Sequence, residues 1–453
     1  MRYVIVGNGV AGTKAAETIR RRDAQGEIIV LSAETVPFYR RPALVEYLLG
    51  RVSLEGLAGR PAALYRDLGI DLRLGATVVG INAQTGDVHL PGGEAIGYDR
   101  LLLAVGLSQA SGVLPGADLA GVVSVWGLGD LPALRDAVRR ARQALVVGEG
   151  VLGLEMARAF RALDLPVIYL LEGPRFWPQA LSPDASALVE KRLRSEGVEV
   201  RPGQPVQAFE GSGGQVRAAL TAAGERFAAG VVGLAAGLRP ALTWAQKAGV
   251  HVEDRVWVDD GLATSLRHVY AAGDAVRLAG ETIAFGWQRA WHQGVVAGVN
   301  MSGGKASYRR RTVSLSTRAF GMPILVMGDP NPEGPIRRER GDYPHDGVHK
   351  ELVLDPEGRI VGAVMVGEVS EASRVEALVR RRVPYSEADP DLLRRLFDLR
   401  YWAAAGAEIL CPVCKFLVQV GEEELRLGRL TCPICGVEFA LHPAGDRFEV
   451  VLE

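Results

Sequence analysis

The stretch MRYVIVGNGVAGTKAAETIRRRDAQGEIIVLSAE, residues 1–34, decides the fold of this chain. Tyr3 to Val6 form a short apolar run rich in β-branched residues, which predicts a buried parallel strand. The run leads directly into Gly7, Gly9 and Gly12, and the residues that follow have helical spacing. The pattern therefore predicts a strand, a glycine turn and a helix.

A turn of this kind suits a dinucleotide. The first glycine makes the tight bend, the second lets backbone N–H groups approach a pyrophosphate, and the third lets the helix pack closely on the strand. A second apolar run, Ile28 to Leu31, ends near Glu34, where a carboxylate can bind ribose hydroxyls. The glycine pattern alone is weak, but both strands and the acid make it a fingerprint.

The same unit occurs a second time. The apolar run Ala144 to Val147 is followed by a glycine turn and a helical pattern, and the strand Val167 to Leu171 closes on Glu172. The glycines of this turn are Gly148, Gly150 and Gly153. Repetition of the whole unit predicts two dinucleotide sites.

Composition limits the other functions. The chain has 453 residues and a formal net charge of -1, which argues against a nucleic-acid or anionic-membrane partner. Its N-terminus begins a strand at once, and no apolar stretch is long enough to span a bilayer, so we expect a cytoplasmic protein. All four cysteines lie after residue 410, so the preceding body cannot use a redox-active disulfide.

Further strand ends carry a family resemblance. Tyr98 to Gly106 ends in Ala104-Val105-Gly106, and Thr264 to Ala275 contains Gly273-Asp274. With the two fingerprints, these motifs resemble the FAD-dependent pyridine nucleotide oxidoreductases, most closely the rubredoxin-reductase and nitrite-reductase FAD-subunit branch. The resemblance covers roughly residues 1–385.

The resemblance implies an α/β fold with two Rossmann-like domains, the NAD domain inserted in the FAD domain. An α+β interface domain follows, which in the family often supports dimerisation, and a homodimer is therefore an open expectation. The expected boundaries are 1–115 and 250–304 for the FAD-binding domain, 116–249 for the NAD(P)H-binding domain, 305–385 for the interface domain, 386–406 for a connector and 407–453 for a four-cysteine ribbon.

The resemblance also assigns the first fingerprint to FAD. The residues implied are Gly7, Gly9, Val10, Ala11 and Gly12 at the pyrophosphate, Glu34 at the adenosine ribose, Val78 at the adenine, Ala104 and Gly106 between domains, and Gly273 and Asp274 at the ribityl or pyrophosphate end. Asp274 is equally suited to cap the following helix. Trp287 and Gln288 begin that helix, where flavin contact and simple core packing both stay open.

Arg41 is the candidate catalytic residue. Residues 39–44, YRRPAL, resemble a family turn whose basic residue lies beside the flavin. A cation there would stabilise electron density on the reduced ring. The alternative is a surface arginine beside a helix start.

The second fingerprint is assigned to the nicotinamide nucleotide, with Gly237 near the nicotinamide. The carboxylate of Glu172 accepts hydrogen bonds from a free 2′-hydroxyl and repels a 2′-phosphate, which favours NADH over NADPH. Arg175 lies close enough in sequence to keep NADPH open.

The four cysteines form two C-x-x-C pairs, Cys411 with Cys414 and Cys432 with Cys435. This spacing predicts a tetrahedral four-thiolate metal site. Zinc is favoured because the stretch between the pairs lacks rubredoxin-like aromatic residues, and iron is the alternative.

Together these features predict an NADH oxidoreductase that passes hydride to FAD and electrons to an acceptor, most simply a rubredoxin-like carrier. One alternative is a disulfide or persulfide reductase that uses the C-terminal thiols. Another is a redox-responsive flavin-binding protein whose zinc ribbon docks a partner.

Overall fold

A computed structural model describes residues 1–58, 62–109, 114–278, 285–308, 314–332, 334–343, 347–397, 408–411, 417–419, 427–432, 437–444 and 447–451. The chain divides into two compact units. The first contains residues 1–41, 53–110 and 238–311, and the second contains 42–52, 111–237 and 312–453. Each unit is thus assembled from segments far apart in the sequence.

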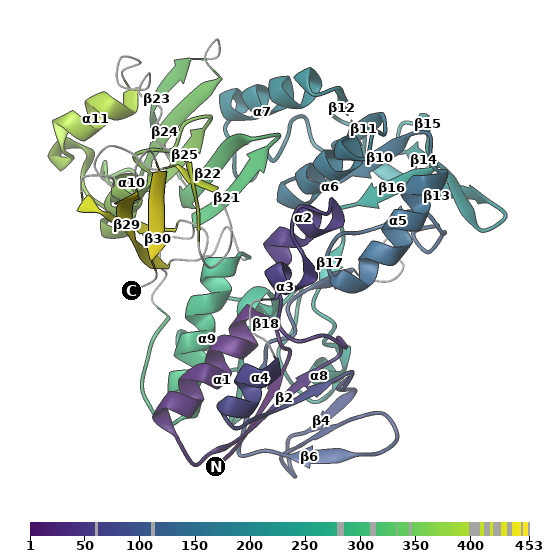
Figure 1. The fold of residues 1–453 in the computed structure, drawn as a ribbon, viewed down its shortest axis with the longest axis vertical. Helices are drawn as coiled ribbons and strands as arrows, with labels where there is room; N and C mark the ends of the chain where they lie inside the picture. Colours follow the sequence, from purple (N-terminus) through teal and green to yellow (C-terminus); the bar gives the residue numbers. More distant parts are fainter. Residues whose placement is uncertain are drawn as a thin grey trace. The chain divides into compact units, whose positions relative to one another are not determined.

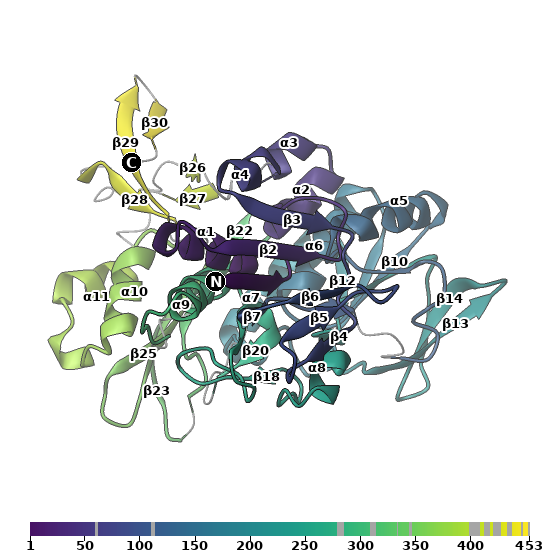
Figure 2. The ribbon, with the colours of Figure 1, turned by 90° about the horizontal axis from the view of Figure 1, so that it is seen from below.

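A parallel five-stranded sheet organises the first unit, in the order β19-β7-β1-β2-β3. The apolar runs of the first fingerprint become its two buried neighbours, β1 and β2, and Figure 2 shows β2 beside β3. The strands are β1 (Arg2–Val6), β2 (Glu27–Ser32), β3 (Ile70–Leu74), β7 (Arg100–Leu103) and β19 (Val269–Ala271).

Two helices pack along each other in this unit, α1 (Val10–Arg22) and α9 (Trp287–Met301) (Figure 1). Small residues permit the contact, because a Cβ on Gly294 would lie 2.4 Å from the backbone oxygen of Ala11. The helix α9 begins at Trp287, and residues 279–284 before it lie outside the described residues.

Shorter elements complete the first unit. The segment 76–90, predicted to contain strands, contributes β4 and β5 to a separate antiparallel sheet. The elements are α3 (Leu54–Leu57), α4 (Ala62–Asp67), β4 (Gly80–Asn82), β5 (Asp87–His89), β6 (Ala95–Gly97), β8 (Ser108–Gln109), β17 (Leu238–Arg239), α8 (Thr243–Lys247), β18 (Val256–Trp257), η3 (Gly273–Ala275) and β20 (Val276–Arg277).

The second fingerprint forms the parallel sheet of the second unit, in the order β12-β11-β10-β16-β9. An antiparallel sheet, β13-β14-β15, accompanies it. The elements are η1 (Arg41–Ala43), where the chain passes into this unit, α2 (Leu44–Leu48), β9 (Val122–Val123), η2 (Leu128–Asp130), α5 (Leu131–Arg140), β10 (Ala144–Val147), α6 (Val151–Ala162), β11 (Val167–Leu170), α7 (Pro183–Ser195), β12 (Val198–Arg201), β13 (Val206–Ser212), β14 (Gln215–Thr221), β15 (Arg226–Ala228) and β16 (Val231–Leu234).

The segment predicted as the interface domain forms an antiparallel sheet in the order β21-β22-β25-β24-β23. The apolar stripe of the predicted connector packs into its core, with Leu392 and Leu396 buried. The elements are β21 (Ser314–Ala319), β22 (Met322–Gly328), β23 (Arg337–Tyr343), β24 (Val348–Leu354), β25 (Ile360–Val366), α10 (Ala372–Arg381), η4 (Tyr385–Glu387) and α11 (Pro390–Phe397).

The C-terminal segment contributes short antiparallel strands, β26 paired with β27 and β28-β29-β30. They are β26 (Glu408–Leu410), β27 (Leu417–Gln419), β28 (Arg429–Thr431), β29 (Glu438–Ala444) and β30 (Arg447–Val451). No helix within the described ranges is both long and apolar enough to cross a bilayer.

Candidate active site

The first glycine turn is shaped by close backbone approaches. Gly7 has φ +111°, and a Cβ on it would lie 2.1 Å from the carbonyl oxygen of Ala104. A Cβ on Gly12 would lie 2.0 Å from the oxygen of Gly7, whereas Gly9 at the start of α1 faces open space. The turn thus leaves room at the helix N-terminus, where an anionic group is favoured.

Several buried polar atoms around this turn have no hydrogen-bond partner among the described residues. Asn8 accepts a hydrogen bond from the Tyr65 hydroxyl at 2.7 Å, but its amide nitrogen bonds nothing. On α9, the buried polar atoms without a partner among the described residues are Trp287 Nε1, Gln288 Oε1 and Gln293 Nε2. Because buried polar groups are normally satisfied, these atoms fit a polar cofactor bound beside α1 and α9.

The Gly273-Asp274 turn is fixed by α9. Gln293 accepts the N–H of Gly273 at 2.8 Å, and the buried Arg289 donates to the Gly273 oxygen at 2.9 Å. Asp274 Oδ1 accepts the N–H of Gly286, the residue before α9, at 3.0 Å. One carboxylate oxygen of Asp274 therefore holds the residue before α9, but Gly286 and not Asp274 occupies the N-cap position of that helix. Sequence reasoning missed Asn8, Arg289 and Gln293, because their roles depend on distant partners.

Arg41 forms an ion pair with Glu34, the acid of the first fingerprint. Its guanidinium contacts Glu34 Oε1 at 2.6 Å and donates to the Tyr39 hydroxyl at 2.9 Å. Glu34 is the residue predicted at the adenosine ribose, so this pairing places Arg41 at that end of the predicted site. A position beside the flavin ring stays a prediction.

The remaining predicted FAD residues lie in the same unit. Val78 is buried in the core beneath the sheet, and Ala104 and Gly106 follow the end of β7. The Trp287 ring packs against Phe38 with 5.6 Å between ring centroids. Trp287 therefore takes part in core packing and also presents the indole N–H described above.

The second glycine turn begins as the first does but differs at its middle glycine, where Gly150 has φ +83° and Gly9 has φ -80°. Gly148 has φ +128° and approaches the Ala235 carbonyl, as Gly7 approaches Ala104. A Cβ on Gly150 would lie 3.4 Å from the Trp177 ring, and one on Gly153 would lie 2.1 Å from the Tyr169 hydroxyl. Burial raises the pKa of Tyr169, which is therefore a neutral phenol.

Glu172 and Gly237, also predicted at this site, follow two strands of the same parallel sheet, β11 and β16. Glu172 is exposed and lies two residues beyond the end of β11. Gly237 has φ +75° and follows β16, which pairs with β10. The described strands thus bring the predicted nucleotide residues to the carboxyl ends of β10, β11 and β16, where ligands bind open α/β sheets.

A charged cluster on α6 was not predicted. Arg158 contacts Glu155 Oε2 and Glu46 Oε1, both at 2.6 Å, and joins α6 to α2. Burial raises the pKa of Glu155, an effect that Arg158 partly offsets. The i,i+3 spacing of Glu155 and Arg158 is visible in the sequence, but Glu46 is 112 residues from Arg158.

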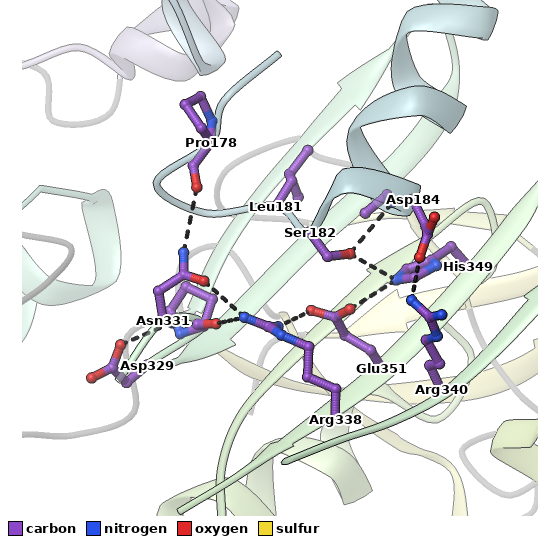
Figure 3. A network of polar contacts seen from close by, with 12 residues as sticks. Pro178, Leu181, Ser182, Asp184, Asp329, Asn331, Arg338, Arg340, His349 and Glu351 are labelled. Carbon is purple, nitrogen blue, oxygen red and sulfur yellow. Dashed lines mark hydrogen bonds and ion pairs between the residues drawn. The ribbon is translucent and has the colours of Figure 1, made fainter. Parts of the chain in front are cut away.

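A buried polar network joins the loop after β11 to the β23–β24 pair (Figure 3). His349 Nε2 lies 3.2 Å from Glu351 and 3.5 Å from Ser182. Arg338 pairs with Glu351 and donates to Asn331 at 2.8 Å. Burial favours the neutral acid, but the hydrogen bond with His349 and the charge of Arg338 hold the pKa of Glu351 below its ordinary value.

The predicted metal site lies partly outside the described residues, because Cys414 and Cys435 fall in segments 412–416 and 433–436. Cys411 and Cys432 are described and fully buried. The residues that the structure describes contain no group of three metal-binding side chains. The four-thiolate site therefore stays a prediction.

Two glycine turns, each feeding a helix on a parallel sheet, define a dinucleotide-dependent oxidoreductase. Residues 1–295 match the model of the pyridine nucleotide-disulphide oxidoreductase family, and the chain belongs to that family. The expectation of an NAD(P)H-dependent FAD oxidoreductase is thereby confirmed. Residues 1–304, which include the predicted flavin domain, contain no cysteine.

Individual relatives agree with this assignment. The chain is 32% identical to the rubredoxin-NAD(+) reductase of Pseudomonas putida over 275 residues, 60% of this chain and 71% of that protein. It is 27% identical to the nitrite reductase [NAD(P)H] of Bacillus subtilis over 387 residues, 85% of this chain, but spans only 48% of that longer protein. The reductase in the covalent putidaredoxin reductase–putidaredoxin complex superposes with a TM-score of 0.78 at 26% identity, over 86% of this chain and 95% of that one.

Proposed function

We propose that this chain oxidises NADH and passes the electrons, through FAD, to a rubredoxin- or ferredoxin-type carrier protein. The observation that carries the proposal is the absence of cysteine from residues 1–410. The first unit therefore has no thiol of its own to receive electrons from the flavin, which favours delivery to a separate acceptor. Relatives named for rubredoxin and putidaredoxin support a small redox protein as the acceptor.

The residues of the first unit would hold the flavin. Bound FAD supplies the chemistry, because it accepts a hydride and releases electrons singly. The start of α1 faces the pyrophosphate, and the unpartnered amide of Asn8 is a donor in reach of that turn. Glu34 accepts hydrogen bonds from the ribose while Arg41 balances its charge.

The proposal predicts a stoichiometric coupling. Each NADH delivers two electrons, so two oxidised one-electron carriers should be reduced per NADH consumed. The measurement is anaerobic stopped-flow reduction of the purified yellow protein by NADH, followed by mixing with oxidised rubredoxin or ferredoxin. Flavin reduction that no such carrier reoxidises would overturn the acceptor class, and release of FMN on denaturation would overturn the cofactor.

We also propose that Cys411, Cys414, Cys432 and Cys435 bind one zinc ion. Zinc held by four thiolates has no redox role and stabilises a small domain. Cys432→Ser should therefore lose the metal and unfold the ribbon while NADH still reduces the flavin. Metal analysis and single-turnover reduction of this variant test the proposal, and stoichiometric iron or loss of flavin reduction would contradict it.

We propose the remaining features of the chain in the same way. They comprise the domain boundaries, the individual cofactor contacts, a homodimer and a cytoplasmic location. The preference for NADH rests on Glu172 and is tested below.

A further inference from the structure

Glu149 occupies the variable position of the second glycine turn, between Gly148 and Gly150. Such turns bind the anionic pyrophosphate through backbone N–H groups, so a carboxylate in the turn is electrostatically unfavourable for the ligand. A residue with that disadvantage requires a compensating role. The contacts of its two oxygens indicate what the role is.

The carboxylate of Glu149 holds the loop that follows β11. Its Oε1 accepts the backbone N–H of Gly173 at 2.6 Å, and its Oε2 accepts a longer hydrogen bond from Gln179 Nε2 at 3.4 Å. A Cβ on residue 173 would lie 2.8 Å from Oε1, so the glycine permits this approach. Gly173 directly follows Glu172, the acid predicted to bind the ribose.

The loop is also held at its other end. Asn331 donates to the Gln179 oxygen at 2.7 Å. It also donates, more weakly, to the Pro178 oxygen at 3.5 Å (Figure 3). Glu149 is thus the anchor nearest to Glu172, and Asn331 is the anchor at the far end of the loop.

Arg175, a cation in the loop that follows β11, is turned into that loop. Among the described residues of segment 172–182, Arg175 is the single lysine or arginine, and its guanidinium faces the backbone oxygens of Pro178 and Leu181, 3.5 Å from each. The edge of the site therefore presents the two carboxylates of Glu149 and Glu172. A 2′-phosphate would add negative charge beside both of them.

We propose that Glu149 is a positioning and specificity-determining residue for the nicotinamide nucleotide, and this inference rests on the proposed use of NADH by the second fingerprint. Its hydrogen bond to Gly173 orients Glu172 toward the ribose 2′-hydroxyl. Its charge, added to that of Glu172, rejects NADPH. One side chain thus links the pyrophosphate turn to the ribose-binding acid.

Two variants separate the hydrogen bond from the charge. Glu149→Gln keeps an acceptor for Gly173 and removes the charge, so the ratio of the NADPH to the NADH dissociation constant should fall about tenfold, mainly through tighter NADPH. Glu149→Ala removes both, so NADH binding should also weaken by about tenfold, while the limiting rate of flavin reduction changes little.

The control is Glu199→Gln, an exposed glutamate on β12 paired with Arg201, which should leave both dissociation constants unchanged. The measurements are stopped-flow flavin reduction over a range of NADH and NADPH concentrations and thermal unfolding of each variant. Equal nucleotide ratios in wild type and both variants would overturn the inference alone. A wild type that prefers NADPH would overturn the proposed donor as well, so the two failures are distinguishable.

Discussion

The two glycine turns begin alike and then differ in backbone and in side-chain chemistry, because Gly9 has φ -80° whereas Gly150 has φ +83°. Their variable positions hold Asn8, whose amide nitrogen is unpartnered among the described residues, and Glu149, whose two oxygens are both bonded. The first turn keeps a donor for a ligand, whereas the second uses its side chain to organise its own loop. The glycines determine the path of the chain, and the residue between them determines what the turn offers.

The ion pairs on the two helices show the same contrast. In the turn-to-helix alignment Lys14 and Glu17 on α1 correspond to Glu155 and Arg158 on α6, and each pair is closed, at 2.7 Å and 2.6 Å. Their polarity is reversed. The neighbours explain this, because Lys14 lies 3.6 Å from the centroid of the Trp291 ring, a cation–π contact, whereas Arg158 also pairs with Glu46.

The largest effect should come from the third glycine of each turn. Gly12→Ala would force its Cβ against the Gly7 oxygen, which is backbone, so we expect loss of FAD and about 1–3 kcal/mol of stability. Gly153→Ala meets the Tyr169 hydroxyl instead and should keep FAD while losing NADH affinity. Flavin absorbance after gel filtration and thermal unfolding measure both effects. Gly129→Ala, with nothing within 4 Å, is the control, and equal flavin loss in both variants would erase the distinction.

Glu34 and Glu172, the acids that end the two fingerprints, should also act on different ligands. Glu172→Ala removes an acceptor for the ribose hydroxyls and a charge that repels a 2′-phosphate, so it should weaken NADH binding about tenfold and tighten NADPH binding. Glu34→Ala should instead reduce FAD retention and leave NADH affinity unchanged. Nucleotide titrations of flavin reduction and dialysis of bound flavin separate the two. An unaltered NADH preference in Glu172→Ala would show that this acid does not bind the ribose.

A smaller effect is expected from Arg41→Ala. Because both members of the pair are more than one-third exposed, losing it should weaken FAD retention by only about threefold. Arg73→Ala, which removes an exposed arginine paired with Asp71 and Glu94, is the matched control. If flavin reduction slows at full FAD occupancy in Arg41→Ala alone, Arg41 acts at the flavin ring as the sequence suggested.

The smallest effect concerns pH and the second unit. Burial raises the pKa of Glu155, so the folded state retains its proton above the ordinary value of 4.5, and the stability from this group is lost as pH rises through the raised pKa. Glu155→Gln has no titrating group at this position and therefore lacks this pH dependence. The unfolding midpoint of the wild type should therefore fall relative to that of Glu155→Gln as pH rises from about 4.5 to 7. A constant difference over this range would show that Arg158 cancels the effect of burial.

Most of the backbone was predictable because it follows local patterns. The apolar run Ala144–Val147 forms a strand with the bounds that the sequence indicates. Strand β23, RRERGDY, was missed because its charged residues lack the apolar alternation of a half-buried strand.

The polar contacts of the site were less predictable. Asn8 bonds Tyr65, 57 residues away, and His349 reaches Ser182, 167 residues away. The motif that contains Arg41 predicts a position beside the flavin but does not determine the direction of the side chain. The contact of Arg41 with Glu34, seven residues away, was therefore not predicted. Such contacts arise only when distant segments have folded together.

The placement of β19 and α9 has a consequence for biosynthesis. Strand β19 completes the first sheet by pairing with β7, and α9 covers α1, although more than 160 residues separate the members of each pair in the chain. The first unit therefore cannot form these contacts while only its N-terminal half has left the ribosome. During that interval the apolar surface of α1 and the edge of β7 lack their partners, so we expect the nascent chain to be prone to association until about residue 300 has been synthesised.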